Sequence, residues 1–509
     1  NKNVSLIIKG TLKSPKTTHM TQNFIIPTEV SHVTNTLENA GFEAFLVGGC
    51  VRDLILNKKP KDWDVTTNAT PEQILVLFPH TFYENTFGTV GIVSDETEDE
   101  TLKTIEVTPY RLESTYSDNR RPDTVTFSKN ITDDLTRRDF TINAIAYSPS
   151  KGQIIDLFKG QEDIVTQTIQ TVGDATERLT EDALRIMRAV RFHVELGFIL
   201  SRETEKAILE HGYLLKNISK ERIRDEFTKI IMSPRPMDGL LMLKKLNILQ
   251  YVVPELEQTI GVEQNRAHSY DVWEHLLRSV QVAADKNWSL DIRLTALFHD
   301  ISKPETRRWG KEQNTWTFYG HEVVGSRVTR KILNNLRYPN KLIDKVVTMV
   351  RWHMFFSDTE QITLSAVRRM IVNVGRENIW DLMDVRICDR IGTGRPKEDP
   401  YRLRKYHAMI EEALRDPITV GMLKIDGKRL IEITGGTPGP KIGHTLHALL
   451  EEVLEDPTKN TVEYIERRSV ELYNMEEGEL KKLGEQGKQL KEEVDKQEVS
   501  KIRKGHRVK

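Results

Sequence analysis

The stretch that most constrains this chain is FLVGGCVRDLILNKKPKDWDVT, residues 45–66. It predicts an apolar strand that ends at Gly48 and Gly49, then a turn and a second strand that carries Asp62 and Asp64. Because side chains two residues apart in a strand face the same way, the two aspartates are expected to project together. Paired carboxylates suit Mg²⁺ bound to substrate phosphates, and glycines let backbone N–H groups approach a phosphate closely. The stretch therefore predicts a site for a metal ion and a nucleotide.

Arg52 lies between the glycines and the aspartates, on the expected polar side of the short amphipathic segment Val51–Leu56. Its guanidinium can brace the same phosphates. Taken singly, Asp-x-Asp is common in turns, and Gly-Gly indicates only a tight turn. The combination at this spacing favours a nucleotidyltransferase site over a chance match.

Composition narrows the class of protein. The chain has 509 residues, which suggests three or four domains. Its net charge of −1 gives no overall attraction to nucleic acid, so RNA binding needs local basic patches. Cys50 and Cys388 are far apart in the sequence, which indicates neither a disulfide framework nor a cysteine zinc site and fits a reducing cytosol. No apolar run reaches membrane-spanning length and residues 1–20 lack a signal-peptide core, so a cytoplasmic location is expected.

Short helical and strand patterns alternate over residues 24–150 and predict a compact α/β unit. Glu106 lies in one of these expected strands, residues 104–108, where a solvent-facing position is the plainer interpretation. Residues 110–127 are polar and hold Arg111, Arg120 and Arg121, a composition typical of a loop.

With these motifs the chain resembles the class II tRNA nucleotidyltransferase/poly(A) polymerase family, which includes the enzymes that build the CCA end of tRNA. The resemblance implies that Gly48, Gly49 and Arg52 bind the nucleotide. It also implies that Glu106, in Glu-Val-Thr-x-x-Arg, is a third catalytic carboxylate beside Asp62 and Asp64. Three carboxylates can hold two Mg²⁺ ions for an in-line phosphoryl displacement. The 110–127 loop corresponds to a flexible loop that accompanies the addition of A after C.

Arg138 and Asp139 belong to a second motif, Arg-Arg-Asp-Phe-Thr-Ile-Asn-Ala, residues 137–144. Two arginines before an acid can hold ribose hydroxyls and phosphate, and a helix-capping and salt-bridge cluster is as consistent with the charges. The motif is similar to the sugar-recognition motif of the same family, which implies a nucleotide-binding role for both residues.

Asp182 and Arg185 lie in residues 174–192, which read as one basic helix that also carries Arg188. Residues three apart share a helix face, so the pair is either an intrahelical ion pair or a base reader. Cytosine and adenine both present an amine donor beside a ring-nitrogen acceptor, which a carboxylate and a guanidinium can match. Glu-Asp-x-x-Arg resembles the family's amino-acid template. That resemblance implies selection of CTP and ATP without a templating nucleic acid, with Arg188 as a further nucleotide-binding residue.

Histidines and aspartates form a separate pattern between residues 268 and 389. A lone histidine on an apolar helix is usually a core residue, but several with aspartates suit a transition metal. Their order resembles the HD phosphohydrolase superfamily, which implies a divalent metal site and action on phosphate at RNA ends, including 2′,3′-cyclic phosphate. Such a domain is also retained in some proteins as an RNA-binding or structural unit. The implied ligands are His275, His299, Asp300 and Asp389, with His321 and His353 as further candidates and Lys303 as a phosphate contact.

The expected fold class is α+β, with a small mixed α/β nucleotidyltransferase head followed by all-α regions. The expected regions are a head (24–150), a neck with the nucleotide-selecting helix (151–215), a body (216–262), an HD region (263–420), a tRNA-binding tail (421–475) and a charged extension (476–509).

The expected function is addition of CCA to tRNA from CTP and ATP with Mg²⁺. Two close alternatives are an A-adding tRNA nucleotidyltransferase and a poly(A) polymerase. A third, of another class, is an HD metal phosphohydrolase with a vestigial head.

Overall fold

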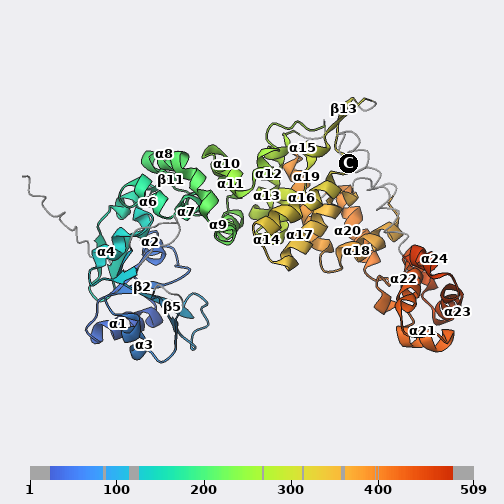
Figure 1. Cartoon of the computed structure of the whole chain (residues 1–509), viewed down its shortest axis with the longest axis horizontal. Helices are drawn as coiled ribbons and strands as arrows, with labels where there is room; N and C mark the ends of the chain where they lie inside the picture. The colour runs from blue at the N-terminus through green and yellow to red at the C-terminus, as the bar shows by residue number, and fades with distance from the viewer. Residues whose placement is uncertain are drawn as a thin grey trace, which may run out of the picture. The chain divides into compact units, whose positions relative to one another are not determined.

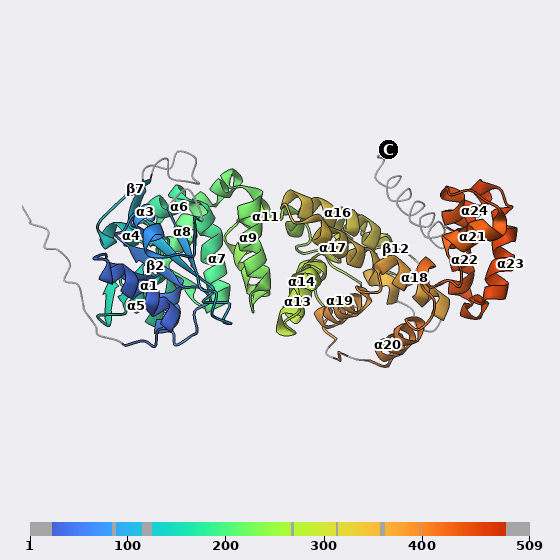
Figure 2. The ribbon, with the colours of Figure 1, turned by 90° about the horizontal axis from the view of Figure 1, so that it is seen from below.

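The computed structural model describes residues 23–83, 88–113, 125–265, 269–311, 314–356, 362–395, 397–398 and 400–484 (Figures 1 and 2). Two compact units make up the chain. Unit 1 contains Asn1–Ser219 and Lys245–Ile248, and unit 2 contains Lys220–Lys244 and Leu249–Lys509. Within the described ranges, no helix has both the length and the apolar character needed to cross a membrane.

Unit 1 is built on a seven-stranded mixed sheet in the order β3-β4-β5-β2-β1-β8-β9. The β2–β5 pair is parallel and the other neighbours are antiparallel. The central strand β1 has the sequence Ala-Phe-Leu-Val and is buried along its whole length, which explains its continuous apolar run. The strands are β1 (Ala44–Val47), β2 (Asp64–Thr67), β3 (Thr81–Tyr83), β4 (Val90–Val93), β5 (Thr104–Pro109), β8 (Ile145–Ser148) and β9 (Gln153–Asp156).

Helices and two small sheets complete unit 1. The pairs β6 (Arg111–Glu113) with β7 (Val125–Phe127) and β10 (Thr168–Ile169) with β11 (Ile199–Leu200) form separate two-stranded sheets. The helices are α1 (Thr28–Asn39), α2 (Gly49–Ile55), α3 (Pro71–Leu77), α4 (Ile131–Thr136), η1 (Thr141–Asn143), α5 (Gly160–Val165), α6 (Ala175–Glu181), α7 (Leu184–Leu196), α8 (Arg202–His211) and η2 (Gly212–Asn217).

Unit 2 is helical apart from the hairpin of β12 (Arg308–Gly310) and β13 (Thr315–Thr317) in its described residues. Helix α13 packs against α14 and α19, and α16 packs against α17. Both views show α22, α23 and α24 side by side (Figures 1 and 2). The helices are α9 (Lys220–Met232), α10 (Pro236–Lys245), α11 (Leu249–Val252), α12 (Pro254–Glu257), α13 (Val272–Asp285), α14 (Leu290–Phe298), α15 (Lys303–Thr306), α16 (His321–Asn335), α17 (Asn340–Trp352), η3 (His353–Phe356), α18 (Leu364–Val374), α19 (Ile379–Gly392), α20 (Tyr401–Ala413), η4 (Val420–Met422), α21 (Gly427–Thr434), α22 (Pro440–Glu455), η5 (Pro457–Lys459), α23 (Val462–Tyr473) and α24 (Glu477–Gly484).

The predicted α+β class, with a mixed sheet first and helices after it, is confirmed. The structure differs in detail at three places. The sheet continues past residue 150 to β9, because that strand pairs with β8. The expected loop over residues 110–127 has paired ends, β6 and β7. Of the charged extension, α24 is described, and Leu480 on that helix is buried against α22.

Candidate active site and metal centre

Two of the carboxylates that the sequence predicts to be catalytic lie on neighbouring interior strands of the head sheet. Strands β2 and β5 run parallel with Asp64 directly opposite Glu106. Asp62 lies in the bend before β2 rather than in the strand, so the strand-alternation argument for the pair does not hold. The two aspartates nevertheless share a neighbour, the turn at Gly48 and Gly49. Two acidic residues therefore lie beside one turn, and the third, Glu106, is paired with Asp64 across the strands.

The backbone of that turn favours glycine at Gly48. Gly48 has φ +82°, in the left-handed region that favours glycine, and it precedes the first residue of α2. A Cβ added to Gly48 would lie 3.1 Å from Arg138 Nη1 and 3.4 Å from Asp64 Oδ2. A Cβ added to Gly49 would lie 3.8 Å from Asp62 Oδ1. The glycines thus keep the backbone close to the acids and to a guanidinium at the start of a helix.

Arg52 is buried, with 9% of its surface exposed, rather than on a polar face as expected. Its Nε and Nη2 donate to Asp53 Oδ1, and its Nη1 donates to Asn143 Oδ1 at 2.8 Å. Its guanidinium also lies 5.5 Å from the centroid of the Phe192 ring. These contacts fix Arg52 close to Gly49, where a Cβ would lie 3.6 Å from Arg52 Nη2.

Arg138 is positioned by a buried acid that sequence reasoning missed. Asp134 on α4 accepts hydrogen bonds from Arg137 and from Arg138 Nη2, the latter at 3.1 Å. Burial alone would raise the pKa of Asp134, but the two guanidinium groups lower it below its usual value. Asp134 therefore stays charged and directs Arg138 toward the glycine turn. The sequence signal for these ion pairs was the position of Asp134, three and four residues before the two arginines.

Asp139 joins the sugar-motif segment to α7. Its Oδ2 accepts from Arg188 Nε at 2.7 Å, and its Oδ1 accepts from the Phe140 N–H at 2.8 Å and from Asn143. Burial raises the pKa of Asp139, but Arg188 and these donors outweigh burial and lower the pKa to about 2. Asp139, predicted to bind the sugar of the nucleotide, and Arg188, predicted to be a further nucleotide-binding residue, thus form one ion pair.

The segment expected to be a single helix over residues 174–192 is interrupted. Helix α6 ends at Glu181 and α7 begins at Leu184, with Asp182 in an extended conformation between them. Asp182 Oδ1 accepts from the Leu184 N–H at 3.1 Å, so the carboxylate caps α7. The prediction that Asp182 and Arg185 share one helix face was wrong, because an N-cap competes with a continuous helix at this aspartate.

Arg185, with 7% of its surface exposed, contacts other groups of unit 1. Its Nη1 donates to Glu181 Oε2 at 2.6 Å and to the Arg178 carbonyl at 2.7 Å, and its Nη2 donates to the Arg137 carbonyl at 3.1 Å. A base that took hydrogen bonds from Arg185 would replace some of these contacts. Of the loop residues, Arg111 lies in β6, whereas Arg120 and Arg121 lie outside the described residues.

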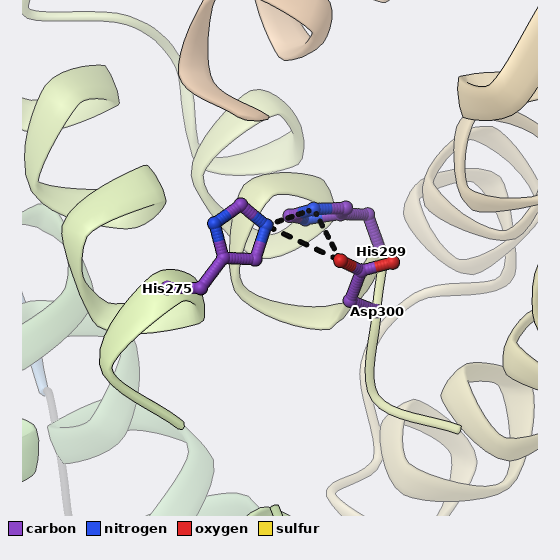
Figure 3. Close-up of side chains that lie close together, drawn as sticks. All are labelled: His275, His299 and Asp300. Carbon is purple, nitrogen blue, oxygen red and sulfur yellow. Dashed lines mark hydrogen bonds and ion pairs between the residues drawn. The ribbon is translucent and has the colours of Figure 1, made fainter. Parts of the chain in front are cut away.

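The second site is a buried cluster of imidazoles and carboxylates in unit 2. His275 on α13, His299 just after α14 and the adjacent Asp300 point toward one another (Figure 3). His275 Nε2 lies 2.9 Å from His299 Nε2 and 3.2 Å from Asp300 Oδ2. Asp389 on α19 adds its Oδ1 at 3.4 Å from His275 Nε2. The four predicted ligands therefore converge from three helical segments.

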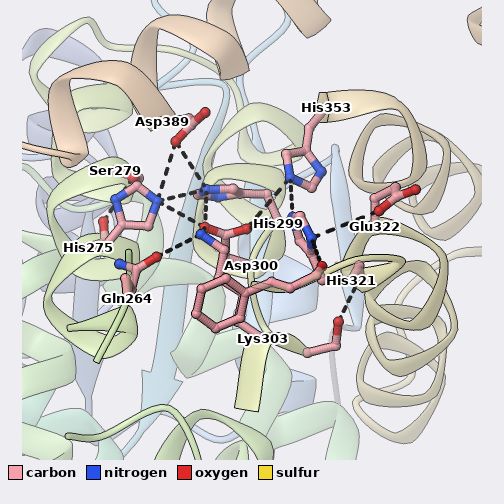
Figure 4. A network of polar contacts seen from close by, with 12 residues as sticks. Gln264, His275, Ser279, His299, Asp300, Lys303, His321, Glu322, His353 and Asp389 are labelled. Carbon is pink, nitrogen blue, oxygen red and sulfur yellow. Dashed lines mark hydrogen bonds and ion pairs between the residues drawn. The ribbon is translucent and has the colours of Figure 1, made fainter. Parts of the chain in front are cut away.

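His321 and His353 approach the same aspartate from its other oxygen (Figure 4). Asp300 Oδ1 lies 3.1 Å from His321 Nε2 and 3.6 Å from His353 Nε2. Among the residues that the structure describes, two groups could hold a metal ion, His275–His299–Asp300 and Asp300–His321–His353. They share Asp300, one carboxylate oxygen facing each group.

The hydrogen-bond partners of three histidines favour the ring form that binds a metal. The Nδ1 atoms of His299, His321 and His353 lie 2.9, 2.7 and 2.7 Å from the carbonyl oxygens three residues before them. A neutral ring that donates from Nδ1 presents the lone pair of Nε2, and it is the Nε2 atoms that converge. The donor set of imidazoles and carboxylates is one that divalent transition metals accept.

Lys303 balances the charge of the cluster. Its Nζ lies 2.5 Å from Asp300 Oδ2 and donates to Gln264 Oε1 at 2.6 Å, two contacts drawn in Figure 4. Burial raises the pKa of Asp300, but Lys303 and then His299 lower it well below its usual value. Burial also raises the pKa of Asp389, but an ion pair with Arg386, one helical turn away, lowers it well below its usual value. The sequence motifs did not single out Arg386.

Comparison with known families assigns a class to each site. Residues 44–170 match the poly A polymerase head domain, and residues 197–260 match a probable RNA- and SrmB-binding site of polymerase A. Residues 272–393, which include the whole imidazole cluster, match the HD domain. The head and its acids are thus of the poly(A) polymerase-type nucleotidyltransferase class, followed by an HD domain.

Curated relatives narrow this class. The chain is 33% identical over 441 residues to the CCA-adding enzyme of Geobacillus thermodenitrificans, an alignment that covers 85% of this chain and 94% of that enzyme. It is also 33% identical to the CCA-adding enzyme of Lactobacillus helveticus, over 86% of this chain and 94% of that enzyme. The chain belongs to the CCA-adding enzyme family of tRNA nucleotidyltransferases.

Solved structures agree with this assignment. The structure is similar to that of the Bacillus stearothermophilus CCA-adding enzyme in complex with CTP, with a TM-score of 0.66 and 28% identity, covering 88% of this chain and 98% of that one. It shares its fold with a Thermotoga maritima CCA-adding enzyme complexed with tRNA, with a TM-score of 0.52 and 20% identity, covering 87% and 94% of the two chains.

Proposed function

We propose that this chain adds C, C and A to the 3′ end of tRNA from CTP and ATP, with release of pyrophosphate and without a nucleic-acid template. The observation that carries the proposal is the grouping of Asp64 opposite Glu106, with Asp62 and Asp64 facing the Gly48–Gly49 turn. The tRNA 3′-hydroxyl oxygen forms a bond to the α-phosphorus as the bond to pyrophosphate breaks. The setting proposed is the cytoplasm, where tRNA and both nucleotides meet.

Asp62, Asp64 and Glu106 would hold Mg²⁺, which neutralises phosphate charge and lowers the pKa of the attacking hydroxyl. The chain's other groups position the nucleotide. The Gly48–Gly49 backbone supplies N–H donors for the triphosphate, and Arg138 lies close to it. Asp139 of the sugar motif is held in place by Arg188 of α7. Most of the acceleration comes from positioning and charge neutralisation.

The base is selected by Asp182 and Arg185 in this proposal. An Asp carboxylate accepts from the exocyclic amine of C or A, and a guanidinium donates to the ring nitrogen beside it. The cap contact of Asp182 and the Glu181 contact of Arg185 are the interactions that a bound base would exchange. Arg111, Arg120 and Arg121 are proposed to belong to the loop needed for A addition.

The tail, residues 421–475, is the proposed tRNA-binding region. Its turn at Gly435–Gly439 leads into α22, whose first-turn N–H groups after Pro440 can donate hydrogen bonds to an RNA phosphate.

The experiment is nucleotide incorporation into tRNA that lacks its CCA end, with CTP and ATP omitted in turn. We expect CTP alone to extend the tRNA by two residues, and ATP to be used only after them. Extension by ATP alone on tRNA ending in CC, with none by CTP, would indicate the A-adding alternative, and long A tails would indicate a poly(A) polymerase. Asp64→Asn should lower incorporation by at least roughly a hundredfold. Glu72→Gln, an exposed acid on α3, is the matched control.

A second activity, hydrolysis of phosphate at RNA ends, is favoured by the shared carboxylate of Asp300. Two metal groups on one carboxylate are an arrangement that can clamp a phosphoryl group from both sides. We expect release of phosphate from 3′-phosphorylated or 2′,3′-cyclic RNA ends, lost with a chelator and restored by a divalent transition metal. His299→Gln should abolish it, and unchanged release from that variant would exclude the cluster as the source.

A further inference from the structure

The β12–β13 hairpin occupies a particular place in unit 2. It is a separate two-stranded sheet, and it connects α15, which begins at Lys303, with α16, which begins at His321. Figure 1 shows β13 at the edge of the helices around α15. On each side of the hairpin, a residue that contacts Asp300 thus lies within five residues of a strand end, Lys303 before β12 and His321 after β13.

Two exposed aromatic side chains lie in the hairpin or just after it, Trp309 and Tyr319. Trp309 pairs across the strands with Trp316, with ring centroids 5.1 Å apart in an edge-to-face arrangement. Such a pair stabilises a hairpin, which accounts for the contact between the rings. It does not account for the exposure of Trp309, which is 51%, or for Tyr319, which is 63% exposed between the hairpin and His321. Exposed aromatic side chains on one short segment of the chain mark an interaction surface.

Basic side chains accompany these rings. The Arg307 guanidinium lies 3.7 Å from the centroid of the Trp316 ring, so it covers that ring and leaves Trp309 as the open one. Arg308 and Lys311 flank Trp309 in the sequence. An aromatic face beside cationic groups is what binds single-stranded nucleic acid, because a base stacks on the ring and a phosphate meets the cation. An apolar protein partner would not require the cations.

The hairpin is linked to the metal cluster through two adjacent residues. Glu263 Oε2 lies 3.2 Å from Arg307 Nη2 at the base of the hairpin. Gln264 accepts from Lys303 Nζ, which in turn contacts Asp300. An RNA end whose phosphate lay at the cluster would therefore have its neighbouring bases near the hairpin.

We propose that Trp309, with Tyr319 and the cations of the hairpin, is a stacking platform for an unpaired base at the end of a single-stranded RNA. The terminal phosphate of that RNA would lie at the cluster around Asp300. The inference rests on the proposed phosphohydrolase function and specifies that the RNA end on which it acts carries an unpaired base.

The test uses the full chain and its Trp309→Ala variant. The readouts are photo-crosslinking of a short 3′-phosphorylated RNA with a photoreactive last base, and the kinetics of phosphate release. We expect wild-type crosslinks in residues 307–319 that Trp309→Ala loses. KM for the RNA should rise roughly tenfold, the loss of one base–aromatic contact, with kcat and hydrolysis of p-nitrophenyl phosphate unchanged. Trp309→Phe keeps an aromatic face and should restore most of the affinity.

Tyr213→Ala removes an aromatic ring exposed to the same 51% on η2 and is the matched control. Unchanged hydrolysis of p-nitrophenyl phosphate by Trp309→Ala establishes that unit 2, which carries Trp309, is folded in the variant. The platform is overturned if wild type gives no crosslink in the hairpin, as a protein-docking surface would, or if Trp309→Ala keeps wild-type crosslinking and KM. If wild type releases no phosphate from any substrate, the phosphohydrolase proposal fails, and the crosslink still decides whether the hairpin binds RNA.

Discussion

Asp139 and Arg185 are the residues whose surroundings say most about the head. Asp139 is a buried carboxylate that stays ionised through Arg188, so it contributes to stability as well as to the proposed sugar contact. Arg185 is tied to Glu181 and to two backbone carbonyls, so reading a base has to compete with contacts already made. Each residue therefore combines a structural and a proposed functional role, which variants can separate.

For Asp139, the dependence of stability on pH separates the structural role from the proposed functional role. Its pKa is about 2 in the folded chain against an ordinary 3.8, so its ion pair stabilises the fold fully above pH 4 and loses that effect as pH falls toward 2. We expect Asp139→Asn to cost about 2 kcal/mol at pH 6, with the difference from wild type shrinking at pH 3. Hydrogen exchange of α7 in the full chain measures it. A cost that stays constant with pH would contradict the ion-pair explanation.

For Arg185, the choice of nucleotide separates the structural role from the proposed functional role. Arg185→Ala removes the donor for the ring nitrogen, so misincorporation of UTP and GTP should rise at least roughly tenfold while incorporation of CTP falls less. Arg185→Lys keeps the positive charge but lacks the planar guanidinium, so its misincorporation should lie between those of wild type and Arg185→Ala. Arg202→Ala, an exposed arginine at the start of α8, is the control. A collapse in rate with wild-type fidelity would leave Arg185 a purely structural role.

At the scale of elements, short segments set the geometry of the head site. The parallel register of β2 and β5 places Asp64 beside Glu106, and η1 carries Asn143, which contacts both Arg52 and Asp139. Helix α5 packs against η1 and begins at Gly160, whose N–H donates to Asp156 Oδ1 at 2.8 Å. The position of η1, and with it the Asn143 contacts, therefore depends on a glycine that is not itself in the site.

A Cβ on Gly160 would overlap the Thr141 carbonyl oxygen of η1. We expect Gly160→Ala to destabilise unit 1 by about 1–3 kcal/mol and to raise KM for nucleotides, because η1 must shift. Gly421→Ala adds a Cβ with nothing within 4 Å and is the control. Thermal unfolding and incorporation kinetics measure the two effects, and wild-type behaviour of Gly160→Ala would refute the packing argument.

At the scale of the whole molecule, the two proposed chemistries lie in different compact units. The acids of the head are in unit 1 and the imidazole cluster is in unit 2. A ligand stabilises only the state that binds it, so a transition metal at the cluster should protect the helices that carry its ligands.

We expect added transition metal, at about a hundred times its dissociation constant, to stabilise α13, α14 and α19 by about 2.7 kcal/mol in hydrogen exchange. His299→Gln should lose this effect and keep nucleotide incorporation. Asp64→Asn should show the reverse. Loss of incorporation in a folded His299→Gln chain would show that the two sites depend on one another.

The sequence by itself determined the local chemistry of this protein. Motif spacing was enough to identify the family, the α+β class and the candidate residues from Gly48 to Asp389, because turns, strand patterns and ligand types are local properties. The metal-ligand candidates in unit 2 were recognisable for the same reason, since imidazoles and carboxylates in that order have few other uses.

Only the tertiary structure decided which groups meet. It placed Asp64 against Glu106 by strand pairing, broke the expected helix at Asp182, and brought Asp134 and Asn143 to the arginines. It also divided the two oxygens of Asp300 between two pairs of histidines. These contacts join residues from separate elements, and no local pattern encodes them, because they depend on register, burial and competition among hydrogen-bond partners.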